Sequence, residues 1–249
     1  MPWTRTYDEP EPQRVNRWLA QNGVCSRREA EALIAAGRVT LDGAVAVAGA
    51  KWAEGMAVCV DGKELKRKPA AKNRRRHVYI ALNKPVGITC TTDTADASNI
   101  IDFIDHQERI FPIGRLDKDS EGLILLTSNG DIVNRILRAE NNHEKEYLVG
   151  VNKPVTEEFL RTMARGVHIH RQVTKPCKVS KLAKYGFRIT LTQGLNRQIR
   201  LMSEALGYKV VQLRRVRIIN VKLGTLKPGA WRNLSDAELA GLLPDVKDW

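Results

Sequence analysis

Apolar residues near the start of the chain recur with the spacing of a helix. In the segment 15–22, Val15, Trp18 and Leu19 fall on one helical face, and polar residues lie between them. Gly23 follows directly, and glycine adopts the left-handed conformation that ends many helices. The pattern therefore predicts a short amphipathic helix over residues 15–22.

A second helix is predicted by the capping-box spacing of Ser26 and Glu29, in which each side chain satisfies a backbone N–H of the other residue. Gly37 marks the expected end of this helix. The next residues, 38–43, combine β-forming side chains with an Asp-Gly pair, so they predict a strand that enters a tight turn. Short strands punctuated by glycines are expected as far as residue 62.

From residue 77 onward, segments with strand spacing are mixed with segments that have helical spacing. The predicted strands cover residues 78–85, 123–126, 145–151, 187–194 and 209–224. The predicted helices cover residues 100–106, 131–139 and 196–206, and a last short helix begins at a second capping box, Ser235 and Glu238. This order predicts an α+β fold in which helices pack on a mixed, largely antiparallel sheet.

A basic segment without large apolar residues separates the two patterns. Residues 66–76 (KRKPAAKNRRR) contain seven basic residues and no acid. Such a segment can attract phosphate groups. It can also serve as a solubilising hinge that makes no specific contact, and the two roles are compatible. We place the domain boundary here, which predicts a small domain over 12–65, a linker over 66–76 and a larger domain over 77–245.

The net charge indicates a polyanionic partner. The 249 residues include 41 Lys and Arg against 28 Asp and Glu, which gives a net charge of +13. Nucleic acid is the leading candidate for the partner, and an anionic membrane surface is the second. The sequence offers no basic amphipathic helix with large apolar residues, and no apolar run near the roughly 18–20 residues that span a bilayer. We expect a cytoplasmic protein without membrane contact.

The cysteines indicate neither a zinc site nor a disulfide framework. They are Cys25, Cys59, Cys90 and Cys177, which are far apart and form no C-x-x-C pair. Free thiols in a reducing cytosol are the simplest explanation. His168 and His170 have the spacing of neighbours on one side of a strand, but no third ligand lies near them in sequence. We interpret them as partly exposed polar residues and predict no metal site.

Basic residues at the start of the second helix indicate a ligand. Arg27 and Arg28 occupy its first turn, where a positive charge opposes the helix dipole but the backbone N–H groups favour phosphate. The strings GVCSRREAE and GRVTLDG, within residues 12–65, resemble the S4 RNA-binding domain. The resemblance implies binding to structured RNA through its shape and phosphates, and the candidate contacts are Arg14, Arg17, Arg27 and Arg28.

Two carboxylates, Asp117 and Asp119, precede the apolar run Leu123–Leu126. Taken alone, they indicate either a catalytic carboxylate or two acids that cap a turn. The segment GRLDKDSEGLILLT contains both, and it is followed along the chain by EKEYLV and GLNRQIRLM. These three elements resemble the pseudouridine synthases of the RsuA/RluB/E/F group, and the resemblance covers nearly the whole chain. Further strings such as NKPVGI are most similar to the 23S rRNA enzymes of that group.

The resemblance implies a role for each of five residues. Asp117 matches the catalytic aspartate, Tyr147 the tyrosine that stacks on the target base, and Arg200 the basic residue that pairs with the catalytic carboxylate. Leu213 matches an apolar residue that lines the pocket, and Arg115 a residue that helps to hold the flipped-out nucleotide. The implied reaction breaks the N1–C1′ bond of uridine, turns the uracil and rejoins it through C5, and it needs no cofactor.

Asp119 has no implied chemistry, and we expect it to be a turn acid that pairs with Arg or Lys. Leu201 stands where many members of the group carry arginine, which removes one expected phosphate contact. We expect a monomer that acts on structured RNA, either 23S rRNA or a pre-ribosomal particle. The alternatives are a 16S rRNA enzyme of the same group and an RNA-binding assembly factor without activity. A glycosidase with paired carboxylates is disfavoured, because no set of sugar-binding aromatic residues accompanies the aspartates.

Overall fold

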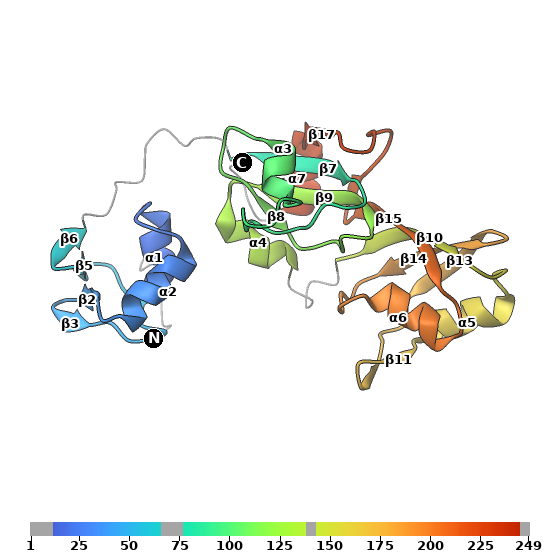
Figure 1. The fold of residues 1–249 in the computed structure, drawn as a ribbon, viewed down its shortest axis with the longest axis horizontal. Helices are drawn as coiled ribbons and strands as arrows, with labels where there is room; N and C mark the ends of the chain where they lie inside the picture. Colours follow the sequence, from blue (N-terminus) through green and yellow to red (C-terminus); the bar gives the residue numbers. More distant parts are fainter. Residues whose placement is uncertain (1–11, 66–76, 138–142, 245–249) are drawn as a thin grey trace, which may run out of the picture. The chain divides into compact units, whose positions relative to one another are not determined.

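The computed structural model describes residues 12–65, 77–137 and 143–244 (Figure 1). The predicted basic linker, residues 66–76, and the predicted last residue of the larger domain, 245, lie outside these ranges. The chain divides into two compact units, residues 1–74 and 75–249. The division falls within the basic segment, and the limits 12–65 and 77–245 stay predictions.

The first unit combines two helices with short strands. Its helices are α1 (Val15–Gln21) and α2 (Arg27–Ala35), and its strands are β1 (Gln13–Arg14), β2 (Val39–Leu41), β3 (Ala44–Val45), β4 (Lys51–Trp52), β5 (Val58–Val60) and β6 (Lys63–Leu65). Four strands form an antiparallel sheet in the order β3-β2-β5-β6, and β1 pairs with β4. The apolar face of α1 packs in the core of this unit, as the helical spacing predicts.

The local signals in the first unit are confirmed. Helix α1 ends before Gly23, which has a φ of 71°. Ser26 Oγ accepts a hydrogen bond from the Glu29 N–H at 3.2 Å, and the Glu29 carboxylate accepts one from the Ser26 N–H at 2.6 Å. Asp42 and Gly43, with φ values of 47° and 84°, form the turn between β2 and β3. The two hydrogen bonds between Ser26 and Glu29 satisfy backbone N–H groups that a free helix start would leave unpaired.

The second unit is an α+β domain built on a nine-stranded sheet. Its helices are α3 (Ile100–Ile104), α4 (Gly130–Leu137), α5 (Glu157–Arg165), α6 (Gln198–Ala205) and α7 (Asp236–Leu242). Its strands are β7 (Tyr79–Lys84), β8 (Phe111–Ile113), β9 (Glu121–Thr127), β10 (Lys145–Val151), β11 (His168–Ile169), β12 (Gln172–Val173), β13 (Lys178–Ala183), β14 (Gly186–Leu191), β15 (Val210–Ile218), β16 (Val221–Lys222) and β17 (Trp231–Asn233).

The main path of the large sheet is β13-β14-β10-β15-β9-β7-β17, and β8 and β16 pair with β9 and β15. The β15–β9 pair is parallel, whereas the other pairings of this sheet within the described residues are antiparallel. The prediction of a mixed, largely antiparallel sheet is therefore confirmed. No helix in the described ranges is both long enough and apolar enough to cross a membrane.

Strand β7 lacks the alternation of apolar and polar sides that its sequence pattern predicts. All six of its residues are buried. Tyr79 and Ala81 pack in one apolar cluster, whereas Ile80 and Leu82 pack in another. Both faces of the sheet are covered at this strand, and a strand covered on both faces needs a continuous apolar run.

Strands β9 and β15 join two parts of the second unit. Figure 1 shows α3, α4 and α7 beside β7, β8 and β9, and α5 and α6 beside β10, β13 and β14. The parallel pairing places Gly122 opposite Arg215. A Cβ atom on Gly122 would lie 2.3 Å from the Arg215 carbonyl oxygen, so the two strands approach closely only because this residue is glycine. The loop that carries Asp117 enters β9 directly before this contact.

Candidate active site

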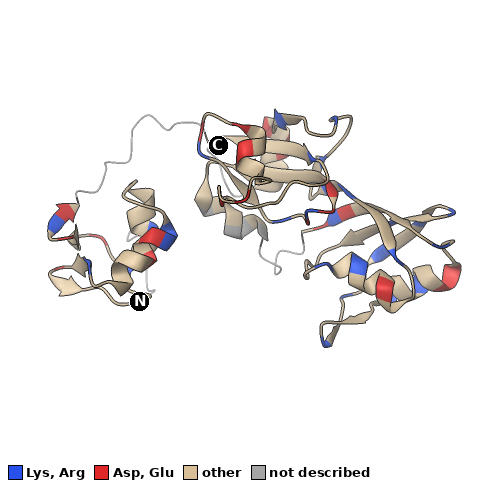
Figure 2. Cartoon of the chain, in the orientation of Figure 1, with Lys and Arg blue, Asp and Glu red and all other residues tan. Residues whose placement is uncertain are grey.

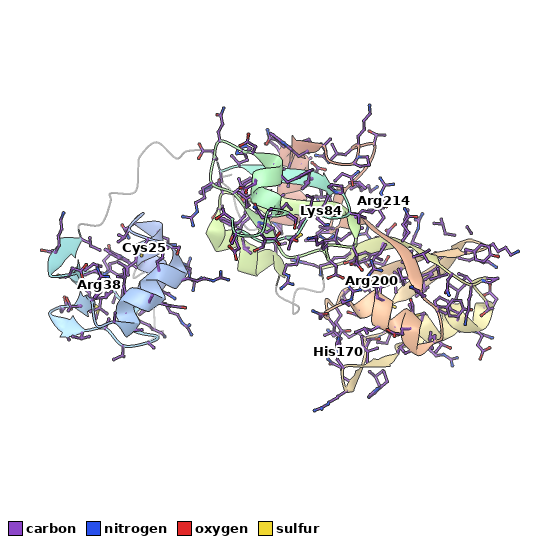
Figure 3. All side chains as sticks on the ribbon, in the orientation of Figure 1. Cys25, Arg38, Lys84, His170, Arg200 and Arg214 are labelled. Atoms are coloured by element: carbon purple, nitrogen blue, oxygen red, sulfur yellow. The ribbon has the colours of Figure 1, made fainter. Side chains whose placement is uncertain are left out.

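A cavity of about 460 Å³ lies within the second unit. Its walls come from the loop between β8 and β9, from β10, from the loop before α6 and from β15. Four of the five residues to which the family resemblance gives a role line this cavity, namely Arg115, Asp117, Tyr147 and Leu213. Arg200 projects from α6 and is not part of the lining (Figure 3).

Asp117 stands on a loop whose backbone is held by hydrogen bonds. The Leu116 N–H donates to the Cys90 sulfur at 3.4 Å, and the Ser120 N–H donates to the Asp117 carbonyl oxygen at 3.0 Å. Leu116 and Ser120 are buried, whereas the Asp117 side chain is 33% exposed. The loop therefore presents the carboxylate to the cavity while its neighbours are fixed.

The carboxylate of Asp117 meets Arg197 and not the expected Arg200. Arg197 Nη1 lies 3.7 Å from an Asp117 carboxylate oxygen, and Arg197 also donates to both carboxylate oxygens of Asp119, at 3.2 and 3.1 Å. Arg200 Nη2 donates to the Asp119 carbonyl oxygen at 2.9 Å and to Ser120 Oγ at 3.0 Å. It also lies 3.4 Å from the Asp119 carboxylate. The expected Arg200–Asp117 pair is therefore wrong, and Asp119 is the arginine-paired acid that we expected.

The positions of the two arginines at the start of α6 explain why Arg197, and not Arg200, meets the Asp117 carboxylate. Arg197 precedes the helix in a left-handed conformation with a φ of 49°, and Arg200 follows one turn later on the same face. Arg200 is 14% exposed and reaches the backbone of the loop, whereas Arg197 is 45% exposed and meets both carboxylates. Burial alone would raise the pKa of Asp119, but the hydrogen bond from Arg197 and the charge of Arg200 hold it below its ordinary value.

Tyr147 lies on β10 directly opposite Arg215 on β15. The guanidinium carbon of Arg215 is 6.0 Å from the centre of the Tyr147 ring. Arg215 is 4% exposed, and its Nε donates to the Leu123 carbonyl oxygen at 2.7 Å. Its Nη1 donates to the Arg115 carbonyl oxygen at 3.3 Å. Arg215 therefore connects Tyr147, the candidate stacking residue on β10, to β9 and to the loop of Asp117.

Two protein-family models match this chain. One, described as RNA pseudouridylate synthase, matches residues 78–205, and the S4 domain matches residues 13–51. The chain is 54% identical to the dual-specificity RNA pseudouridine synthase RluF of Escherichia coli strain K12, over 94% of this chain and 80% of that protein. The chain belongs to the RNA pseudouridylate synthase family.

Other members of the pseudouridylate synthase family agree with this assignment. The chain is 33% identical to ribosomal small subunit pseudouridine synthase A of Salmonella typhimurium, over 92% of this chain and 99% of that protein. A crystal structure of a pseudouridylate synthase aligns with a TM-score of 0.67 at 29% identity, covering 92% of this chain and 99% of the other. The predicted family, the S4 domain with an α+β synthase domain, and the isomerase activity are confirmed.

The synthase domain contains two lysines for which the sequence patterns indicate no role, Lys84 and the half-buried Lys145. Lys84 is fully buried, and its ammonium group donates to the carbonyl oxygens of Pro85 at 3.0 Å and Ile88 at 2.8 Å (Figure 3). Burial lowers the pKa of Lys84. Lys145 lines the cavity two residues before Tyr147 on β10, so both side chains lie on the same face of the sheet. The strand spacing in KEYLV is the signal that could have identified Lys145.

The candidate RNA contacts in the first unit differ in exposure, and Figure 2 shows basic residues in both units. The exposed candidates are Arg14, Arg27 and Arg28. Helix α2 begins at Arg27, so the expected pair does occupy its first turn. Arg17 is half-buried. Arg38 nearby donates to both carboxylate oxygens of Asp61, at 2.7 and 2.5 Å, so its charge is neutralised within the unit.

The two histidines do not lie on one strand. His168 belongs to β11, but His170 lies in the turn before β12 with a φ of 47°. Both side chains are exposed, as we expected. His170 Nε2 is 3.0 Å from the Asn196 carbonyl oxygen, which connects this hairpin to the loop that lines the cavity (Figure 3).

Proposed function

We propose that this synthase converts a uridine in the peptidyl-transferase domain of 23S rRNA to pseudouridine, with Asp117 as its catalytic carboxylate. The observation that carries the proposal is the position of Asp117 on the wall of a cavity that Tyr147 also lines, 3.7 Å from the Arg197 guanidinium. A carboxylate in this position can act as a nucleophile or as a base.

The cavity walls suit a uridine that has left its stack. The flipped uracil lies on the flat face of Tyr147, Leu213 supplies apolar contact, and Arg115 holds the nucleotide at the exposed edge. Asp117 attacks C1′ of the sugar or C6 of the base, or removes the C2′ proton to give a glycal. In each route the N1–C1′ bond breaks, the uracil turns and C5 bonds to C1′, while Asp117 leaves C1′ or C6 or returns the proton to C2′. The C5 proton is then lost and N1 gains a proton. Arg200 positions the Asp117 loop through its backbone.

The choice of 23S rRNA rests on the family resemblance and on relative similarity. The chain is 54% identical to RluF and 33% identical to a relative named for the small ribosomal subunit, which supports the former target. The name of the first relative also includes dual specificity, so a second RNA substrate belongs to the proposal. The S4 domain supplies the contact with structured RNA, and an rRNA substrate implies that the enzyme works in the cytoplasm.

The Asp117→Asn variant tests the catalytic role, and Asp119→Asn is the matched control. Asparagine preserves the shape of Asp117 but supplies no carboxylate, so the isomerisation rate should fall by about 10³-fold or more. Asp119→Asn loses charge pairing with Arg197 and Arg200 but no reacting group, so its rate should fall by about 10-fold or less. The assay is tritium release from C5-labelled uridine in an rRNA fragment, measured beside a thermal melt and RNA affinity. Substantial turnover by Asp117→Asn, or a folded but inactive Asp119→Asn, would disprove these roles.

The target is tested by mapping pseudouridine in total RNA from strains with and without the gene. One site in the peptidyl-transferase domain of 23S rRNA should lose its modification when the gene is absent. A second lost site in another RNA would support dual specificity. Loss confined to 16S rRNA would show that the proposed target is wrong and would leave the role of Asp117 untouched.

A further inference from the structure

Arg215 carries a buried hydrogen-bond donor without a partner. Carbonyl oxygens satisfy its Nε and Nη1 groups, but its Nη2 is shielded from solvent and has no hydrogen-bond partner among the residues that the structure describes. A buried charged donor that stays unpaired is destabilising, so it is rare in proteins without a functional reason. Because Arg215 lines the cavity, a bound substrate is the available partner for Nη2.

Lys145 adds a second cation to the same cavity. Its ammonium nitrogen lies 3.9 Å from the position that a Cβ on Gly194 would occupy, which places it against the loop before α6. Within the described ranges, the Lys145 side chain makes no hydrogen bond or ion pair. Burial, and then the charge of Arg215, lower the pKa of Lys145. The two cations therefore line one cavity, Arg215 buried and Lys145 half-buried, and neither forms an ion pair with a carboxylate of the described chain.

We propose that Arg215 and Lys145 stabilise the negative charge that develops on the uracil ring during the reaction. Arg215 Nη2 donates to a carbonyl oxygen of a uracil that lies on Tyr147, and the Lys145 ammonium group strengthens the positive field at the same ring. The proposal rests on the role of Asp117 given above, and it adds two catalytic residues to that site.

A negatively charged uracil occurs in every route open to Asp117. If the carboxylate attacks C1′, or removes the C2′ proton, the electron pair of the N1–C1′ bond leaves with the uracil and spreads over N1, O2 and O4. If it attacks C6, the charge appears on O4 before the bond breaks. C5 of the charged ring then donates an electron pair to C1′, while Asp117 leaves C1′ or C6 or returns the proton to C2′, and the C5 proton leaves to a base. Fixed cationic donors in a poorly solvated site favour such a state strongly.

The depth of Arg215 argues against a backbone phosphate as its ligand. Arg215 is 4% exposed and lies opposite the candidate stacking residue Tyr147. Arg115 and Arg197 line the same cavity but are exposed, so they are better placed to meet the hydrated phosphates of an RNA chain. A flat base that has left its stack can reach the buried guanidinium, whereas a phosphate stays near the rim.

The main test compares Lys145→Met with Lys227→Met. Both variants lose one positive charge, but Lys227 is exposed and lies outside the cavity. Single-turnover conversion is measured on an rRNA fragment with uridine, C5-deuterated uridine or 5-fluorouridine at the target, together with RNA affinity and a thermal melt. Fluorine stabilises the uracil anion, and 5-fluorouracil has no C5 proton to lose.

We expect Lys145→Met to slow the conversion of uridine by about 10²-fold, with unchanged RNA affinity and no C5-deuterium isotope effect. On 5-fluorouridine the loss should shrink to about 10-fold, because the better leaving group needs less stabilisation. Lys227→Met should convert both substrates at the wild-type rate. Wild-type behaviour of Lys145→Met would overturn the proposal.

Three other results for Lys145→Met would also overturn it. Weakened RNA affinity with a wild-type rate would assign Lys145 to a phosphate. An isotope effect together with a wild-type rate on 5-fluorouridine would make Lys145 the acceptor of the C5 proton. Equal losses on uridine and 5-fluorouridine would show a general effect on the shape of the site.

Arg215→Lys tests the second cation, because lysine keeps the charge but cannot serve two carbonyl oxygens and the substrate together. If this variant melts like the wild type or remains folded at the assay temperature, its rate should fall less on 5-fluorouridine than on uridine, as expected for Lys145→Met. Equal losses on both substrates would remove Arg215 from the proposal. Asp117→Asn, assayed in parallel, should fail on both substrates. Activity of Asp117→Asn would disprove the catalytic role of Asp117 itself, a failure distinct from that of the cation pair.

Discussion

Gly122→Ala should destabilise the second unit strongly, because β9 and β15 touch at this residue. Gly122 has a φ of 107°, a conformation that costs a residue with a Cβ about 1–3 kcal/mol. The added Cβ would lie 2.3 Å from the Arg215 carbonyl oxygen and 2.7 Å from its nitrogen. Non-bonded carbon contacts are favourable at about 3.5 Å, so the two strands must separate by about 1 Å. Overpacking of this kind adds about 1–3 kcal/mol or more.

The two costs together give a loss of about 2–6 kcal/mol in the free energy of unfolding. For a domain of this size, each kcal/mol lowers the melting temperature by about 2–4 °C, so the expected shift is about 4–24 °C. The isomerisation rate should fall as well at temperatures where the variant is folded. Movement of β15 displaces Arg215 from the Leu123 carbonyl oxygen and from the Tyr147 ring.

Gly87→Ala separates the cost of the positive φ from the cost of the close contact with β15. Gly87 also has a positive φ, 95°, but an added Cβ would meet nothing within 4 Å, so this variant should lose only about 1–3 kcal/mol. The measurement is the thermal melt of the full chain, followed by circular dichroism. Equal shifts for the two variants would show that β9 and β15 separate without cost and would refute the close contact at Gly122.

Further changes test the site, a pH-dependent contact and the RNA-binding surface. Tyr147→Phe keeps the flat face and should still capture an RNA that contains fluorouridine, whereas Tyr147→Leu should not; equal capture would contradict stacking. Hydrogen bonds from Arg232 at 2.7 Å lower the pKa of Glu238, and the stability that they add is lost as the pH falls through this lowered pKa. Glu238→Gln should therefore lower the melting temperature by about 2–4 °C at neutral pH and by less near about pH 3, and equal losses would contradict this explanation. Neutralising Arg27 and Arg28 together should reduce the slope of log affinity against log salt by about one unit per lost contact and keep the rate at saturating RNA; an unchanged slope would disprove their phosphate contacts.

Helix ends could be predicted from the sequence because they depend on neighbouring residues. The Ser235–Glu238 capping box starts α7, and Gly207 follows the end of α6 with a φ of 78°. Helix α5 was not predicted, although Thr156 caps it by accepting a hydrogen bond from the Phe159 N–H at 3.1 Å. The signal at α5, threonine followed by two glutamates, is as local as the others and was open to the same reasoning.

The contacts between charges in the site could not be predicted in the same way. Arg215 meets Tyr147 because β15 pairs with β10 in a register that shifts next to this pair, and no local pattern shows that pairing. Arg197 and Arg200 stand one helical turn apart, so both are able to reach a carboxylate on the facing loop. The family resemblance therefore predicts which residues gather around the cavity, and the tertiary structure decides which atoms touch.

The motif GRLDKDSEGL gains a physical explanation from these contacts. Ser120 is buried and accepts a hydrogen bond from Arg200, and Gly122 permits the close approach of β15, so both fix the loop to the rest of the domain. Asp117 is the acid of this loop whose carboxylate lines the cavity. A change at Ser120 or Gly122 should therefore lower rate and stability together, because it moves the loop. The change Asp117→Asn should lower the rate alone, since asparagine keeps the shape of the side chain. This difference separates the residues that position the proposed catalytic group from that group itself.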